Sequence, residues 1–231
     1  GRRGMQTMIA KSQFAYEYIK ERILTGQLSP KADISEKQIQ EELGISRTPV
    51  HEALKRLEDD GFVETYSRKG TFVTDVTMET VRDLYETRLL IEPTITRNAV
   101  NLVPREWMED LRRRLIEERP FLTREDIHDV MALDTELHTT VASYCSNSFL
   151  RNSLHLIYEH DRRIRLKTER NPAQVRFSQR EHVVILDAML AGDEERTEQL
   201  AREHVVHSRD LTYESLGFMK SGLFKLSELP V

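Results

Sequence analysis

Residues 34–74 constrain the fold of this chain more than any other stretch of its 231 residues. Ser35, followed three residues later by Gln38, has the spacing of a capping box, which predicts a short helix beginning directly after Ser35. Gly44 ends that helix, and Ser46 is placed to cap a second one. Two helices joined by so short a turn predict a helix-turn-helix.

The second predicted helix and the residues after it complete the motif. One face of this helix is apolar and consists of Val50, Ala53, Leu54 and Leu57. After Gly61, residues 62–66 and 71–74 can pair as a hairpin with Arg68 and Lys69 at its tip. A helix-turn-helix with such a wing places its second helix in the major groove of DNA. The alternative, a small helical domain with ordinary solvated charges, leaves the agreement of capping, turn, apolar face and basic wing unexplained.

Charge is distributed unevenly along the chain. The net charge is −5, which at first argues against a nucleic-acid partner. Residues 1–75, however, contain 12 Lys and Arg against 12 Asp and Glu, so the whole excess of negative charge lies in residues 76–231. Binding to phosphates depends on local charge. We therefore expect a basic face, from which the acidic residues point away, made of Lys37, Arg47, Lys55, Arg56, Arg68 and Lys69.

The chain is predicted to divide near residue 76. We expect a flexible N-terminus over residues 1–10, a winged helix-turn-helix over 11–75 and a tail without assignment over 217–231. Residues 76–216 are predicted to form an antiparallel all-α bundle of about six helices, so the fold class is mainly α. Pro93 lies inside the first bundle helix and is expected to kink it. Separated by Pro, Asn and Gly residues, the predicted bundle helices span 78–102, 105–119, 123–145, 149–168, 173–191 and 193–215.

No sequence feature indicates a membrane or an oxidising compartment. No apolar run has the length needed to cross a bilayer, and no signal peptide opens the chain. The single cysteine, Cys145, cannot form an internal disulfide. We therefore expect a cytoplasmic protein in which Cys145 is a buried, inert thiol.

Four polar residues fall on the apolar faces of the predicted bundle helices. Asp134 and His138 lie four residues apart, so both project from the apolar side of the third helix. His182 belongs to the apolar stripe of the fifth helix and His204 to that of the last. Burying these groups without partners would be costly, and a shared divalent cation removes that cost. Three imidazoles and one carboxylate suit Zn²⁺, Ni²⁺ or Mn²⁺, although a hydrogen-bonded core residue is the alternative for any single histidine.

Arg88 is a further charged residue on an apolar stripe, that of the first bundle helix. A buried guanidinium needs a carboxylate or phosphate in bidentate geometry. That partner is either an acidic residue of the bundle or an anionic small molecule bound beside the metal, and the sequence leaves both open.

The order and spacing of these segments resemble the GntR family of transcriptional regulators, specifically the FadR subfamily with an FCD-type effector domain. The resemblance covers about residues 11–215. In the first domain it rests on SEKQIQEELGISRTPVHEALKRLEDDGFV at 35–63 and RKGTFV at 68–73. In the second it rests on RLLIEP at 88–93, DTELH at 134–138, SYCSN at 143–147, HVVILDAML at 182–190 and the late His204.

The resemblance implies a homodimer whose paired winged domains bind a palindromic operator in double-stranded DNA. His51 stands where the family usually has Arg, which is expected to weaken that contact and to shift operator preference. The positions that correspond to the family's DNA contacts are Lys37, Ser46, Arg47, Thr48, His51, Lys69 and Gly70.

For the second domain the resemblance implies small carboxylate effectors, bound by the metal and Arg88, with Asn147 as a further contact. Asn147 is equally well placed to cap the next helix. Leu137 replaces the family's usual Phe before a metal-binding histidine, which is expected to alter the size of the pocket. The metal-binding positions of the family correspond to Asp134, His138, His182 and His204.

The function expected from these residues is that of a regulator, not an enzyme, whose operator affinity responds to a small carboxylate bound near a divalent metal. An alternative of another class is a metal-dependent hydrolase with an accessory DNA-binding domain. That chemistry needs a general base beside the metal, and Glu136 and Glu181 are predicted to point off the ligand faces. A third interpretation keeps the regulator and makes the metal purely structural.

Overall fold

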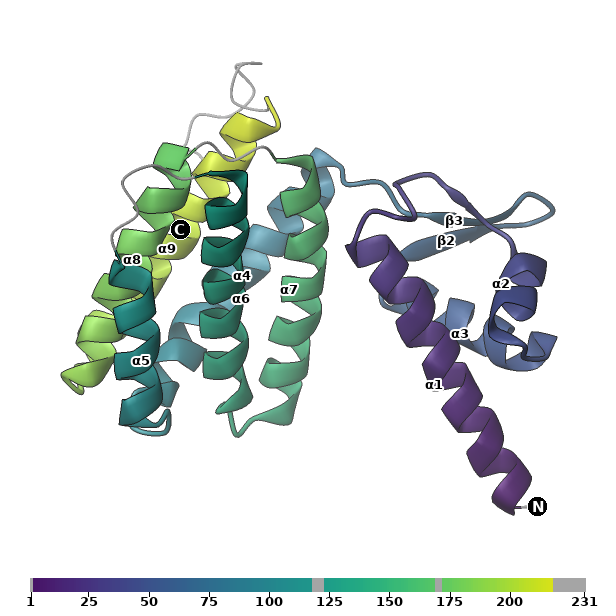
Figure 1. Cartoon of the computed structure of the whole chain (residues 1–231), viewed down its shortest axis with the longest axis horizontal. Coiled ribbons are helices and arrows are strands. Elements are labelled where there is room, and N and C mark those ends of the chain that lie inside the picture. Colours follow the sequence, from purple (N-terminus) through teal and green to yellow (C-terminus); the bar gives the residue numbers. More distant parts are fainter. Residues whose placement is uncertain (1, 118–122, 169–171, 218–231) are drawn as a thin grey trace. The chain divides into compact units, whose positions relative to one another are not determined.

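The computed structural model describes residues 2–117, 123–168 and 172–217, shown in colour in Figure 1. Within this part of the chain there are nine helices and three short strands, which confirms the mainly α fold class. The chain divides into two compact units: residues 1–77 with 159–166, and residues 78–158 with 167–231. The predicted boundary falls two residues before this division, and the inclusion of 159–166 in the first unit was not predicted. Nearly all of the predicted tail, from residue 218 on, lies outside the described residues.

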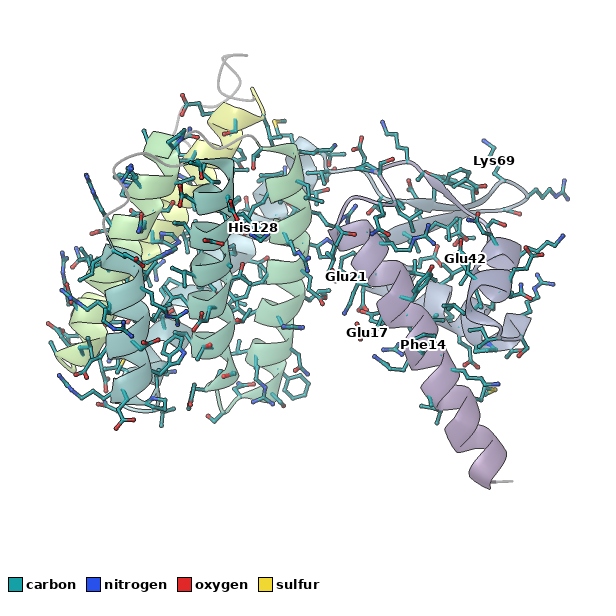
Figure 2. All side chains as sticks on the ribbon, viewed as in Figure 1. Phe14, Glu17, Glu21, Glu42, Lys69 and His128 are labelled. Carbon is teal, nitrogen blue, oxygen red and sulfur yellow. The ribbon has the colours of Figure 1, made fainter. Side chains whose placement is uncertain are left out.

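The first helix, α1 (Arg2–Leu24), precedes the helix-turn-helix. The segment that was expected to be flexible is helical from Arg2 onward. Phe14, labelled in Figure 2, is 55% exposed, whereas Ala15 and Ile19 are buried. Five residues separate Phe14 from Ile19, a rotation of about 140° around a helix, so the two cannot share one face.

Helices α2 (Glu36–Leu43) and α3 (Arg47–Asp59) form the predicted helix-turn-helix. The hydroxyl of Ser35 accepts a hydrogen bond from the backbone N–H of Gln38 at 3.3 Å, and Gly44 ends α2 in the left-handed conformation with φ of 63°. Ser46 occupies the N-cap position of α3, but its side chain makes no capping hydrogen bond. The buried face of α3 carries the four predicted apolar residues together with Pro49.

A three-stranded antiparallel sheet with the order β1-β3-β2 completes the first unit. Strands β2 (Val63–Tyr66) and β3 (Gly70–Val73) form the predicted hairpin, in which Tyr66 pairs with Gly70. The N–H of Lys69 donates to the carbonyl of Tyr66 at 3.0 Å, and Figure 2 shows Lys69 on this hairpin. Strand β1 (Asp33–Ile34) was not predicted, because two residues carry no readable alternation.

The second unit is an all-helical bundle (Figure 1). Four of its helices close a ring, since α4 contacts α9, α9 contacts α8, α8 contacts α6, and α6 contacts α4. One buried apolar cluster joins α5 to this ring and includes Leu111, Leu137 and Leu186. None of the described helices is long and apolar enough to cross a membrane. The helices are α4 (Met78–Ala99), α5 (Arg105–Ile116), α6 (Arg124–Ser143), α7 (Ser148–Lys167), α8 (Pro172–Leu190) and α9 (Glu194–Ser215).

Candidate functional site

The four predicted metal ligands meet inside the ring of helices. Helix α6 carries Asp134 and His138, α8 carries His182 and α9 carries His204, and all four residues are buried. One nitrogen from each histidine ring lies within 4.8 Å of the other two. Nε2 of His182 lies 3.2 Å from Nε2 of His204 and 3.5 Å from the Oδ1 atom of Asp134. The fold therefore brings together one carboxylate and three imidazoles from three helices.

The donor set fits a divalent metal ion on one further observation. Nε2 of His138 is buried and has no hydrogen-bond partner among the described residues. Leaving a buried polar atom without a partner costs about 1–3 kcal/mol. The same nitrogen lies 3.9 Å from Asp134 Oδ1, on the side of the ring that faces the cluster. An ion in the cluster would supply the partner that the protein itself does not.

A carboxylate lies behind each of two histidines. Oε1 of Glu92, on α4, lies 3.1 Å from Nδ1 of His138, and Oε2 of Glu181, on α8, lies 2.9 Å from Nδ1 of His204. The sequence did not predict the contact of Glu181 with His204. Glu181 does lie to the side of the His182 face, but it reaches across to α9, and α8 and α9 are in direct contact. Only the packing of these two helices brings that carboxylate to His204.

Burial and hydrogen bonding act in opposite directions on these groups. Burial works to raise the pKa of Glu92, but the charge of Arg88 and the hydrogen bond from His138 hold it well below its usual range. Burial likewise works to raise the pKa of Glu181, and its hydrogen bonds with histidines outweigh this effect and lower the pKa. Burial lowers the pKa of His204 even though Glu181 works to raise it. Both glutamates are therefore ionised near neutral pH and His204 is a neutral imidazole.

Arg88 lies at the bottom of the same site and is fully buried, as its apolar stripe predicted. Of the two partners that the sequence left open, the structure contains the acidic residue. Nε of Arg88 donates to Glu92 Oε2 at 2.8 Å, and Nη2 donates to Oε1 at 3.3 Å. The guanidinium also lies 5.9 Å from the ring centre of Tyr158, whose own ring packs against His138. Arg88, Glu92 and His138 thus form one connected polar group.

A small pocket opens beside this group. Its walls include Glu92, His138, Tyr158 and His204. Asn147 is not among its lining residues. Asn147 is exposed, and its side-chain oxygen accepts hydrogen bonds from the N–H groups of residues 149 and 150, which makes it the N-cap of α7. The structure thus shows the capping role, which was one of the two alternatives for Asn147.

The predicted DNA contacts lie on the exposed surface of the first unit. Arg47 and Thr48 occupy the first turn of α3 and His51 the next, and all three are exposed. Glu36, at the start of α2, holds two of them, because its Oε2 accepts from Arg47 Nε at 3.2 Å and its Oε1 lies 3.1 Å from His51 Nδ1. This contact fixes the two side chains side by side at the start of the helix. The other predicted contacts are exposed as well: Lys37, Ser46, Lys69 and Gly70.

Several acidic residues of this unit form hydrogen bonds with α1, away from the start of α3, as expected for a basic DNA-binding face. Glu42 of α2, labelled in Figure 2, accepts hydrogen bonds from Arg22 and Tyr18 of α1. Asp60 accepts from the hydroxyl of Tyr16 at 2.6 Å. Glu36 is an exception, because it contacts Arg47 and His51 at the start of α3. Its position at the N-terminus of α2, directly after the capping serine, could have indicated this contact.

Comparisons with known proteins agree with this arrangement. Residues 11–73 match the bacterial regulatory proteins of the gntR family, and residues 83–207, more than half of the chain, match the FCD domain. The chain is 24% identical over 193 residues to an uncharacterised HTH-type transcriptional regulator, YdhC, of Bacillus subtilis (strain 168), which spans 83% of this chain and 86% of that one. It is 22% identical over 194 residues to the HTH-type transcriptional repressor RspR of Escherichia coli (strain K12), spanning 84% and 85%.

Solved structures show the same fold. McbR/YncC of E. coli superposes with a TM-score of 0.71 at 19% identity, covering 89% of this chain and 98% of the other. A GntR regulator from Rhodococcus sp. RHA1 superposes with a TM-score of 0.69 at 21% identity, covering 90% and 98%. With a winged helix-turn-helix at its N-terminus and an FCD domain behind it, the chain belongs to the GntR family of transcriptional regulators, in the FadR subfamily.

Proposed function

We propose that this regulator binds a palindromic operator as a homodimer, and that a small carboxylate bound at a divalent metal in the helical bundle sets its operator affinity. The observation that carries the proposal is the buried cluster of Asp134, His138, His182 and His204, in which Nε2 of His138 has no hydrogen-bond partner in the described part of the chain. Ligand binding there changes DNA affinity only if the ligand binds two states of the protein with different free energies.

The donor set and the pocket support a metal with an exchangeable position. Three imidazoles and one carboxylate suit Zn²⁺, Ni²⁺ or Mn²⁺, and a small pocket lined by His138 and His204 lies beside the cluster. Bound there, the ion would supply a positive charge to an effector carboxylate. Arg88 would contact that carboxylate only by giving up its bond with Glu92. Glu92 would therefore compete with the effector for Arg88.

The geometry gives the hydrolase alternative no comparable support. A hydrolase needs a carboxylate beside the open position of the metal, ready to take a proton from water. Glu181 lies behind His204 and is bound through both of its oxygens, to His204 and His207. Glu136 is paired with Arg114. Turnover assays on metal-loaded protein would reveal such an activity if it exists.

Thermal-shift measurements test the ligand part of the proposal. Zn²⁺, Ni²⁺ or Mn²⁺ is expected to raise the Tm of the wild-type protein, and small carboxylates are expected to raise it further only when the metal is present. A His182→Ala variant should lose both effects, whereas His128→Ala, a histidine outside the cluster, should keep them. A wild-type Tm that no metal changes would contradict the proposal.

DNA binding is tested at Arg47. Duplexes selected from a random library by the wild-type protein should contain a palindromic site, and Arg47→Ala should bind that site about 10- to 100-fold more weakly, as expected for the loss of one strong contact of about 1–3 kcal/mol. Arg105→Ala, which removes an exposed cation from α5, is the matched control and should bind normally. Equal affinity of the Arg47→Ala protein in a gel-shift titration would remove Arg47 from the interface.

A further inference from the structure

Two of the histidines in the cluster are held from behind in the same way. Glu92 lies against Nδ1 of His138 at 3.1 Å, and Glu181 lies against Nδ1 of His204 at 2.9 Å. The opposite ring nitrogens face inward: Nε2 of His204 lies 3.2 Å from Nε2 of His182, and Nε2 of His138 has no hydrogen-bond partner among the described residues. The two glutamates come from α4 and α8, so this arrangement arises twice from different helices.

The carboxylates determine which nitrogen of each ring carries the proton. A neutral imidazole has one N–H donor and one lone pair, and an ionised carboxylate only accepts. A carboxylate at Nδ1 therefore requires the proton on Nδ1 and leaves the lone pair on Nε2. The contacts of both carboxylates with nitrogen donors fit this arrangement: Glu92 is paired with the guanidinium of Arg88 at 2.8 Å, and Glu181 contacts both His204 and His207. In the metal-free protein, Nε2 of His138 and Nε2 of His204 thus already carry the lone pairs that can bind a cation.

Glu181 is itself fixed in place. Its second oxygen, Oε1, lies 2.5 Å from Nδ1 of His207, one turn further along α9 from His204. The ring of His207 packs edge-on against Phe177 of α8, with the ring centres 5.4 Å apart. Held at both oxygens, the Glu181 carboxylate has little freedom to turn away from His204. Outer-shell carboxylates of this kind orient histidine ligands and raise their basicity.

We propose that Glu92 and Glu181 are the positioning residues of the metal site, which hold His138 and His204 by Nδ1 so that Nε2 of each ring binds the ion. The inference rests on the metal binding proposed above. It assigns roles to two carboxylates that would not themselves touch the metal. It also assigns His207 a supporting role, to hold Glu181 in place.

Metal affinity of full-length variants tests the proposal. Zn²⁺ alone is the probe, and its dissociation constant is measured by competition with a chelating dye. Glu181→Leu is expected to weaken Zn²⁺ binding by about 10- to 100-fold, and Glu181→Gln by less, because an amide oxygen still accepts from Nδ1 but carries no charge. Glu136→Gln, a half-buried glutamate of α6 paired with Arg114, is the control and should bind as the wild type does.

The outcomes separate this inference from the metal proposal. Wild-type protein that takes up no Zn²⁺ overturns both. Wild-type protein that binds Zn²⁺ while Glu181→Leu binds it equally well overturns the positioning role alone. The free energy of unfolding without metal is measured for each variant, because a merely structural role would change this quantity and leave the affinity of the folded protein unchanged.

A second measurement needs no variant at Glu92, whose replacement also disturbs Arg88. Long-range ¹H–¹⁵N spectra of the metal-free wild-type protein report which ring nitrogen of each histidine is protonated. His138 and His204 are expected to carry the proton on Nδ1. In Glu181→Leu the spectrum of His204 should change and that of His138 should not. Protonation of Nε2 in the wild-type rings would overturn the proposal.

Discussion

Glu92 is the residue on which the buried charges of the bundle depend. It is 2% exposed, it is bonded to a guanidinium that is fully buried, and it touches His138 on the other side. A buried ion pair adds little stability compared with apolar residues of the same size, but removing one partner leaves a charge without compensation. Removing one partner of the Arg88–Glu92 pair is therefore expected to lower the stability of the protein by more than the intact pair adds to it.

Replacing Glu92 by Ala is expected to lower the free energy of unfolding of the metal-free protein by about 3–5 kcal/mol, because the buried Arg88 would lose its two hydrogen bonds to this carboxylate. Urea denaturation measures the change. Glu136→Ala, which breaks the half-buried pair with Arg114, is expected to cost at most about 1 kcal/mol. If the two losses were equal, Arg88 would not depend on Glu92.

At this scale the sequence predicts which polar residues are buried better than it predicts their partners. Asp134, His138, His182 and Arg88 each interrupt an apolar stripe, so helical periodicity was enough to place them inside the bundle. Glu92 lies four residues after Arg88 on the same stripe and could have been recognised in the same way. The contact of Glu181 with His204 could not, because it depends on how α8 and α9 pack, which no pattern within one helix records.

Helix ends show how far local signals determine an element. The serine cap before α2 and the glycine after it were predicted and are present. The predicted capping box is incomplete, because the side chain of Gln38 donates to Glu42 and not to the backbone of Ser35. Helix α4 ends three residues earlier than predicted, because the apolar residues Val100 and Leu102 continue the sequence pattern beyond the end of the helix. Helix α5 ends at Ile116, and its predicted end at residue 119 lies outside the described residues. Ser46 occupies the N-cap position of α3, but its side chain makes no capping hydrogen bond. Its hydroxyl can therefore bond to another acceptor or donor.

The two capping serines are expected to respond differently to replacement. Ser35→Ala should lower the free energy of unfolding by about 1 kcal/mol, because it removes the bond to the N–H of Gln38. Ser46→Ala should change stability by less but should weaken operator binding, because a hydroxyl at the start of α3 is placed to bind a phosphate. Thermal unfolding and gel-shift titration of both variants test this. Comparable stability losses with unchanged DNA affinity would make Ser46 an ordinary cap.

For the whole molecule, the sequence was sufficient to predict two parts of different character, one with a β-hairpin and one entirely helical. It could not predict that residues 159–166 group with the first unit, because that grouping depends on contacts distant in sequence. Nor does net charge describe the surface that is predicted to bind DNA. Residues 1–75 carry no net charge but expose Lys37, Arg47 and Lys69, while Glu42 and Asp60 are bonded to α1.

Operator binding is expected to depend strongly on salt despite the net negative charge of the chain, because binding releases the counterions of the contacted phosphates. Lys69→Ala should weaken binding to all sequences alike and should reduce the slope of log K against log salt concentration by about 1 for each wing that contacts a phosphate. Fluorescence anisotropy at a series of salt concentrations measures the slope. An unchanged slope would mean that the wing lies away from the DNA backbone.

Only residues 74–77 lie between the last strand of the wing and the first turn of α4. With two soft torsions per residue, this connection has about eight torsional degrees of freedom. A hydrogen bond from the N–H of Val76 to the side chain of Asp75 restrains some of them. Even when fully extended, these four residues span at most about 14 Å. The chain therefore limits how far the end of the wing can lie from the start of the helix that carries Glu92.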